Sequence, residues 1–150
     1  MGLTRRDRGM VALAIVLDIA FHASGETVVS GAELAERTAI VRRTLEPLLQ
    51  SLSRARILDS TRGPQGGYRL GRPARLIKVS EVVDTGLATL EDSGTDLSGK
   101  LQRAVVFPLW DEFDAALRTL AESLTIEDLL KRAAKAGLKK AAADPLNYFI

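Results

Sequence analysis

Hydrophobic residues recur with helical spacing in three stretches of the first 56 residues. A capping box at positions 4–7 precedes an almost wholly apolar run at 10–21, which predicts a buried first helix ending near 23–25. A second capping box, from Ser30 to Glu33, predicts a short helix that reaches about residue 37. After a break at 38–39, the spacing of four leucines predicts a third helix over about 41–56. A short helix, a tight turn and a longer helix outline a helix-turn-helix.

Short extended stretches and a glycine-rich segment follow the third helix. Residues 57–61 and 68–70 are typical of strands, and the tip between them contains one proline and three glycines. A hairpin directly after a helix-turn-helix is a wing, although a glycine-rich hairpin by itself is more often only a turn. We expect a further short helix to start at Ser80 and to end at Gly86. The polar stretch at 91–96 then marks a domain boundary.

An apolar seam dominates the C-terminal part of the chain. Its members are spaced 3, 4, 3 and 4 residues apart, as in a helix that pairs with another helix: Trp110, Phe113, Leu117, Leu120 and Leu124. Pro108 suits the first turn of this helix, because its missing N–H would be unpaired there in any case. The seam fits either an intramolecular core or a dimer interface, and the small size of the segment favours the homodimer. Another helix is expected to start at residues 125–128.

The expected fold is mainly α with a small β-hairpin, a winged helix-turn-helix domain followed by a long dimerisation helix. The predicted divisions are a DNA-binding domain over 1–90 with its wing at about 57–70, a loop and dimerisation helices over 91–136, and a C-terminal tail over 137–150.

Composition excludes several classes of chemistry. The chain has no cysteine and one histidine, His22, which removes disulfides, thiolate nucleophiles, cysteine-ligated zinc and iron–sulfur clusters. None of the 19 acidic residues forms a recognisable catalytic pair, so we expect no enzyme, no metal site and no cofactor. No apolar run approaches the roughly 20 residues that span a bilayer, and no cleavable signal pattern opens the chain. We therefore expect a cytoplasmic protein without a membrane partner.

Charge is divided unevenly between the two halves of the chain. Residues 1–75 hold 12 arginines, no lysine and 7 acidic residues, giving +5, whereas residues 76–150 carry −3. The planar guanidinium binds phosphate and guanine with two hydrogen bonds, so an arginine-rich half suits nucleic acid. A solvated basic surface is the alternative that charge alone leaves open.

The order of motifs resembles the Rrf-two family of bacterial winged helix-turn-helix transcriptional regulators. The resemblance covers about residues 1–135, and its most specific part is the wing sequence RGPQGGYRL at 62–70. The other matching segments lie at positions 3–4, 34–37, 45–46 and 109–110.

The resemblance implies a homodimer that binds double-stranded DNA at a pseudo-palindromic operator, most simply as a repressor. Thr4 and Arg5 would hold a phosphate at the start of the first helix. The recognition helix would present Arg42, Arg43, Thr44 and Glu46 to the major groove, with the arginines at guanine edges or phosphates and the glutamate at a cytosine amino group. The wing would contribute Arg62, Gly63, Pro64, Gln65, Gly66, Gly67, Tyr68 and Arg69. For each side chain, a solvated surface role is the alternative.

Two departures from the family pattern matter. Pro47 lies early in the recognition helix and fits best if that helix begins near Arg43 or Thr44. Cluster-binding members place three cysteines, and often a histidine, ahead of the dimerisation helix, but residues 91–107 contain no cysteine and Phe107 stands where the histidine would be. We expect a cysteine-less member without an iron–sulfur cluster, and His22 is not a plausible replacement ligand.

The last four residues offer a separate hypothesis about the signal. Asn147, Tyr148, Phe149 and Ile150 resemble the tail of serine acetyltransferase, which inserts its terminal isoleucine into O-acetylserine sulfhydrylase. Binding of that enzyme by a regulator has precedent within the family and would connect this chain to cysteine metabolism. The alternative is that this apolar tail folds back onto the dimer. A rival function is a protein-interaction module that regulates a metabolic enzyme, with weak or no DNA binding.

Overall fold

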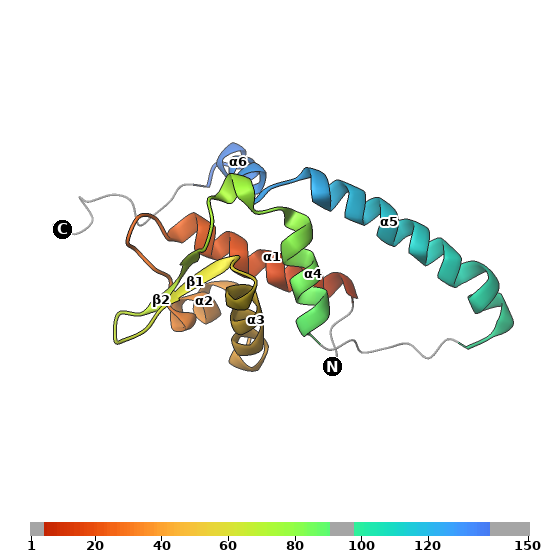
Figure 1. The fold of residues 1–150 in the computed structure, drawn as a ribbon, viewed down its shortest axis with the longest axis horizontal. Coiled ribbons are helices and arrows are strands. Elements are labelled where there is room, and N and C mark those ends of the chain that lie inside the picture. Colours follow the sequence, from red (N-terminus) through yellow and green to blue (C-terminus); the bar gives the residue numbers. More distant parts are fainter. Residues whose placement is uncertain (1–4, 91–97, 139–150) are drawn as a thin grey trace.

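The computed structural model describes residues 5–90 and 98–138, and it has the expected mainly α fold with one small hairpin. The body contains α1 (Arg5–His22), α2 (Gly31–Thr38), α3 (Arg42–Arg54), the strands β1 (Leu58–Thr61) and β2 (Gly67–Leu70), the 3-10 turn η1 (Ala74–Leu76) and α4 (Val79–Thr89). A π-helical turn, η2 (Gln102–Val106), leads into α5 (Phe107–Ser123), and α6 (Ile126–Lys135) follows. Figure 1 shows α5 extending away from the body, while α6 returns to pack on α1.

The capping box predicted for α2 and the helix start predicted at residues 125–128 are confirmed. The Ser30 hydroxyl accepts from the Glu33 amide at 3.1 Å, and the Glu33 carboxylate accepts from the Ser30 amide at 2.8 Å. Thr125 and Asp128 make the same reciprocal pair at the start of α6. Each box satisfies amides that have no partner inside the helix, so these two helix starts are fixed by their own sequence.

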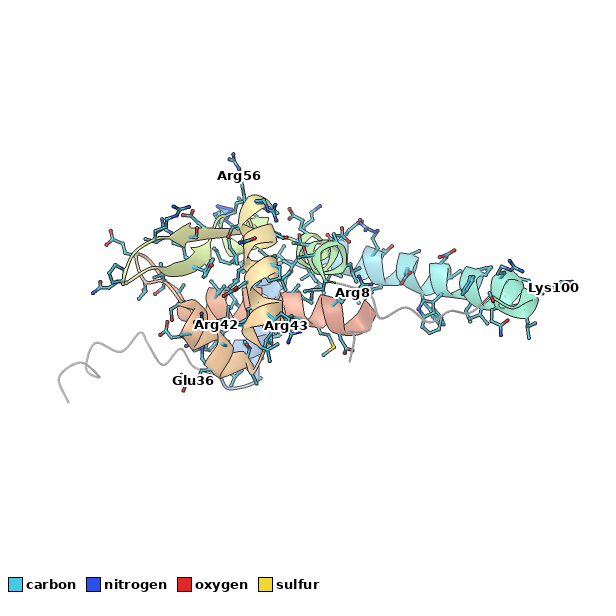
Figure 2. All side chains as sticks on the ribbon, turned by 90° about the horizontal axis from the view of Figure 1, so that it is seen from below. Arg8, Glu36, Arg42, Arg43, Arg56 and Lys100 are labelled. Carbon is cyan, nitrogen blue, oxygen red and sulfur yellow. The ribbon has the colours of Figure 1, made fainter. Side chains whose placement is uncertain are left out.

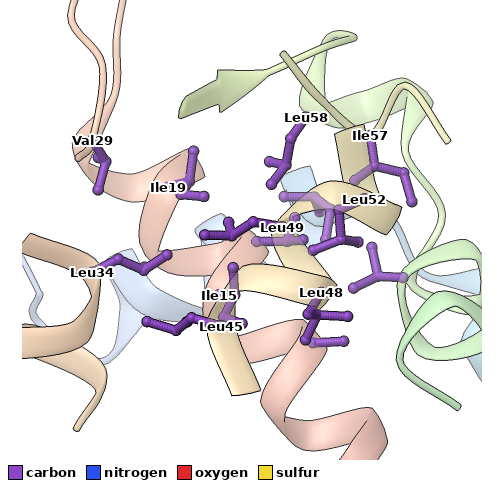
Figure 3. Packing of buried hydrophobic residues seen from close by; sticks show 14 of the residues in the cluster. Ile15, Ile19, Val29, Leu34, Leu45, Leu48, Leu49, Leu52, Ile57 and Leu58 are labelled. Carbon is purple, nitrogen blue, oxygen red and sulfur yellow. The ribbon is translucent and has the colours of Figure 1, made fainter. Parts of the chain in front are cut away.

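An aliphatic core holds the body together (Figure 3). Ile15 and Ile19 of α1 meet Leu34 of α2 among fully buried side chains. The leucines predicted for the inner face of α3 are all buried: Leu45, Leu48, Leu49 and Leu52. Because these leucines line one face, the opposite face of α3 is turned to solvent.

The hairpin is a wing with a contribution from a distant segment. β1 and β2 pair antiparallel from Leu58 opposite Leu70 to Thr61 opposite Gly67. Val29, in the connection between α1 and α2, also exchanges two hydrogen bonds of 2.8 Å with Tyr68. The wing is therefore anchored to the start of the helix-turn-helix as well as to its own turn.

The expectation for α4 was wrong at both ends. The helix begins at Val79, with Lys78 as its N-cap, and it continues past Gly86 to Thr89. Gly86 does not end the helix because it serves a helix crossing: a Cβ there would lie 2.6 Å from the Arg8 carbonyl oxygen in α1. The buried Arg8 side chain in turn donates from Nη1 to the carbonyls of Leu87 at 2.6 Å and Leu90 at 3.1 Å.

Pro108 lies in the first turn of α5, as expected, but the helical path starts earlier. The π-helical turn η2 precedes α5 without a break, since Val106 and Phe107 both have helical backbone angles. Proline cannot donate to the carbonyl four residues before it and its ring crowds that carbonyl, which a wider turn accommodates. Within residues 5–90 and 98–138, no helix is both long and apolar enough to cross a membrane.

Candidate nucleic-acid interface

A tight turn joins α2 to α3 and sets the direction of α3. Ala39 has the left-handed angles φ 58° and ψ 21°, and its amide donates to the Ala35 carbonyl at 3.0 Å. The Thr38 hydroxyl donates to the Leu34 carbonyl at 2.6 Å, which closes the last turn of α2. Val41 then begins α3 by accepting from the amides of Thr44 and Leu45. The predicted helix-turn-helix is thus present, with α3 in the position of a recognition helix.

The first turns of α3 carry the predicted polar residues. Arg42, Arg43 and Glu46 are exposed, whereas Thr44 is half-buried. Figure 2 shows Arg42 and Arg43 at one end of α3 and Arg56 at the other. Arg42 Nη1 lies 3.9 Å from Glu46 Oε1, and Arg43 has no ion-pair partner among the described residues. The helix begins at Arg42 rather than at Arg43 or Thr44, so Pro47 lies inside it, on the exposed side.

An ion pair fixes α2 against α1. The Arg37 guanidinium donates to Asp18 from Nη2 at 2.8 Å and from Nε at 3.0 Å, and Asp18 is largely buried. These hydrogen bonds stabilise the charged guanidinium and raise the pKa of Arg37. His22 lies 3.9 Å from the same carboxylate, one turn after Asp18 on α1. His22 thus lies beside a carboxylate that also binds Arg37. Within residues 5–90 and 98–138, no group of three metal-ligating side chains comes together.

The backbone of the wing requires glycine at three positions. Gly63 has φ +112°, which a side chain disfavours. A Cβ at Gly66 would lie 2.2 Å from the Thr61 carbonyl oxygen, and one at Gly67 would lie 2.5 Å from that of Val29. The paired glycines therefore allow the hairpin to close and to meet the α1–α2 connection.

The two arginines of the wing differ in their ion-pair partners. Arg69 faces Asp59 across the hairpin, with Nη2 at 3.3 Å from Oδ2, whereas Arg62 at the exposed tip has no ion-pair partner in the described part. A polar hollow lies between the wing and the start of α2, lined by Gly31, Ser60, Thr61 and Arg62 among others. Tyr68 is half-buried and packs against the core. Pro64 and Gln65 are exposed at the tip.

The predicted dimerisation seam is mostly solvent-exposed in the single chain. Trp110 is 54% exposed and Leu117 is 55% exposed, and Phe113 and Leu120 are similar. The ring of Trp110 meets that of Phe113 edge-on, with centroids 5.3 Å apart. Leu124 differs, because it caps the end of α5, is half-buried and accepts from the Val79 amide. Further exposed apolar residues extend the surface beyond the seam: Leu101, Val105, Phe107 and Leu109.

Some predicted residues lie outside what the structure describes. Thr4 and the tail residues Asn147, Tyr148, Phe149 and Ile150 fall in undescribed segments, and the Arg5 side chain is not described. Sequence reasoning missed Arg8, whose side chain turns into the body and donates to carbonyl groups at the end of α4. Nothing in the local sequence distinguishes this arginine from its neighbours at positions 5 and 6.

Comparisons with known proteins identify the family. A family model described as Rrf2, iron-dependent transcriptional regulator, matches residues 5–132. The HTH-type transcriptional regulator IscR of Cereibacter sphaeroides is 31% identical over 131 residues, which cover 83% of this chain and 84% of that protein. The structure of T. potens IscR superposes with a TM-score of 0.67 at 32% identity, covering 89% of this chain and 90% of the other. CymR of B. subtilis gives a TM-score of 0.62 at 25% identity, covering 83% and 94%. The chain therefore belongs to the Rrf2 family of winged helix-turn-helix transcriptional regulators.

Proposed function

We propose that the protein is a homodimeric repressor that binds a pseudo-palindromic operator in double-stranded DNA. The observation that carries the proposal is the arrangement of α3. Its leucine face is buried, so Arg42, Arg43 and Glu46 are presented together at the exposed end of the helix. The N-terminal end of a recognition helix is the part that reaches base edges in the major groove.

Each polar group has a partner on DNA that matches its chemistry. Arg43 has no ion-pair partner within residues 5–90 and 98–138, so no ion pair with these residues must break when it reaches a guanine edge or a phosphate. Arg42 and Glu46 lie 3.9 Å apart in a weak, exposed pair that costs little to separate. Glu46 is then available to accept from a cytosine amino group. Arg62 at the wing tip follows the phosphate backbone or the minor groove, and Thr4 and Arg5 take a phosphate at the start of α1.

The exposed apolar face of α5 supports the homodimer. Trp110, Phe113, Leu117 and Leu120 are about half exposed on one helix, and a row of exposed apolar side chains of this kind marks a protein–protein contact. Pairing with a second α5 covers this surface and relates the two recognition helices by a two-fold axis. Two such helices match half-sites about one helical turn of DNA apart. Occupancy of an operator that overlaps a promoter then represses transcription.

The family description names iron, and the donor set of this chain does not fit a cysteine-ligated cluster. The sequence contains no cysteine, and cluster-binding members of the family use three. The proposed function therefore uses no cluster, and the signal that sets DNA affinity has another origin.

We propose that the signal that sets the DNA affinity comes from cysteine metabolism. The related CymR is described as the global cysteine regulator of B. subtilis. In this proposal, residues Asn147 to Ile150 insert into O-acetylserine sulfhydrylase, where Ile150 and the aromatic side chains fill the entrance of the active site. The test is a titration of the pyridoxal phosphate fluorescence of that enzyme with the intact protein and with a form that lacks Ile150. Equal responses from the two forms contradict insertion of the tail.

Operator binding is tested by selecting DNA from a random pool and measuring its affinity by fluorescence anisotropy. We expect Arg43→Ala to lose about 1–3 kcal/mol of base discrimination. Arg132→Ala is the matched control, because it removes the same charge from α6, on the opposite side of α1 from α3 (Figures 1 and 2). Affinity should also fall steeply with salt, by about a thousandfold or more between 50 and 200 mM for 6–10 phosphate contacts. A flat salt response together with tight binding to the sulfhydrylase favours the alternative protein-interaction module.

A further inference from the structure

Two features of the residue that begins the recognition helix bear on what it contacts. Val41 is the N-cap of α3, with φ −68° and ψ 147°, and it makes no side-chain hydrogen bond to the helix. The corresponding residues of α2 and α6 are Ser30 and Thr125, whose hydroxyls accept from the first-turn amides. The N-caps of α4 and α5, Lys78 and Val106, also make no such bond. A serine or threonine in place of Val41 would stabilise the start of α3, so the chain forgoes a favourable cap at this position.

Val41 is also strongly exposed. Its exposed fraction is 67%, compared with 53% for both Met10 and Leu76, the other exposed large hydrophobic residues in residues 5–90. It does not belong to the apolar face of α5, because it lies on the helix-turn-helix. The dimer interface therefore does not explain this exposed valine.

The neighbours of Val41 indicate what covers it. Arg42 and Arg43 follow directly, and both are exposed at the same end of α3 (Figure 2). When that end enters the major groove, the short side chain of the N-cap residue reaches the groove surface together with them. The apolar feature that base edges present there is the C5-methyl group of thymine. A β-branched side chain is stiff, so the two methyl groups of valine are held in place without loss of rotamer freedom.

We propose that Val41 is a specificity-determining residue that reads a thymine through its C5-methyl group, one thymine in each half-site. This inference rests on the proposed function and assigns a base preference to a residue outside the polar set. In this arrangement, the stability lost at the helix start is the cost of an apolar contact that a capping hydroxyl would not make.

The test removes one methyl group at a time from the DNA. Each thymine of the selected operator is replaced in turn, in both half-sites, by deoxyuridine, which lacks only the C5-methyl. For the wild-type dimer we expect one symmetric position at which affinity falls, by about fourfold per half-site and about fifteenfold when both are replaced. For Val41→Ala the affinity for the thymine operator should be lower already, and the deoxyuridine effect should shrink towards onefold.

Two further variants separate base reading from structure. Val41→Ser restores a capping hydroxyl, so its melting temperature should rise by about 2–4 °C while its affinity for the thymine operator falls and its deoxyuridine effect disappears. Leu76→Ala removes another exposed apolar side chain, in η1, and should keep the full deoxyuridine effect. A wild-type dimer that binds a selected operator but tolerates deoxyuridine everywhere overturns the inference and leaves the proposed function intact. An effect of equal size in Val41→Ala also overturns it. If no sequence is selected at all, the proposed function fails, and the inference fails with it.

Discussion

Gly86 lies where α4 crosses α1, and its replacement by alanine tests how closely the two helices must approach. A Cβ on Gly86 would be 2.6 Å from the Arg8 carbonyl oxygen and 2.7 Å from the Ala12 Cβ. Both distances are below any ordinary carbon contact. The carbonyl belongs to the backbone of α1 and cannot move away by a side-chain rotation. The two helices must therefore separate to make room for the Cβ.

The expected cost follows from two opposing terms. Overpacking a core contact costs about 1–3 kcal/mol, and the upper end applies here because the obstacle is backbone. Alanine is more favourable than glycine in a helix interior by about 1 kcal/mol. The free energy of unfolding should therefore fall by about 2 kcal/mol, which lowers the melting temperature by about 4–8 °C for a chain of this length.

Gly9→Ala is the matched control, because Gly9 lies on α1 at the same crossing. Its added Cβ would meet only the Val83 side chain, with Cγ1 at 3.3 Å and Cγ2 at 3.9 Å, a contact that a small shift relieves. We expect this variant to be as stable as the wild type, or up to about 1 kcal/mol more stable. Urea unfolding followed by circular dichroism, at one fixed protomer concentration, measures both. If Gly86→Ala proves as stable as Gly9→Ala, the close crossing does not constrain residue 86.

Three other predictions concern ion pairs, pH and the α5 surface. Asp18→Asn should lower the free energy of unfolding by about 2 kcal/mol because Arg37 loses its charged partner, whereas Lys131→Ala, which breaks an exposed pair, should change it by about 0.5 kcal/mol or less. The hydrogen bond from the Ser30 amide lowers the pKa of Glu33 below its usual value of 4.5, so this carboxylate stabilises the fold above pH 4.5 and stops doing so as the pH falls through the lowered pKa. Melting curves between pH 7 and pH 3 should therefore show Glu33→Gln less stable than the wild type at neutral pH, with a difference that vanishes in acid; a difference that persists at pH 3 contradicts this origin. Leu117→Asp should give monomers by light scattering, and a dimer of unchanged mass would show that α5 is not the interface.

The sequence predicted the helix-turn-helix and the wing well because their determinants are local. Capping boxes define the starts of α2 and α6, and the leucine spacing identifies the buried face of α3. Even the pairing of Arg69 with Asp59 follows from the hairpin register, although it was not anticipated.

The sequence-based predictions failed where the role of a residue depends on a contact with a residue far away in the sequence. Gly86 was interpreted as a helix end, but its lack of a side chain accommodates α1, which lies far away in the sequence. The inward turn of Arg8 was not predicted, since it depends on carbonyl groups at the end of α4, about 80 residues later in the sequence.

The bonds from Arg8 to the end of α4 have a consequence for how the chain is made. They join residues 79 and 82 positions apart, and α1 and α4 share the most extensive contact among the described elements. The part of the α1 surface that α4 covers must therefore stay open until α4 has been made. At about 5–20 residues per second, translation of that interval takes roughly 4–16 seconds. During that interval α1 is a natural substrate for chaperones, and nascent chains stalled before residue 79 should remain protease-sensitive while chains that extend well past residue 90 become resistant.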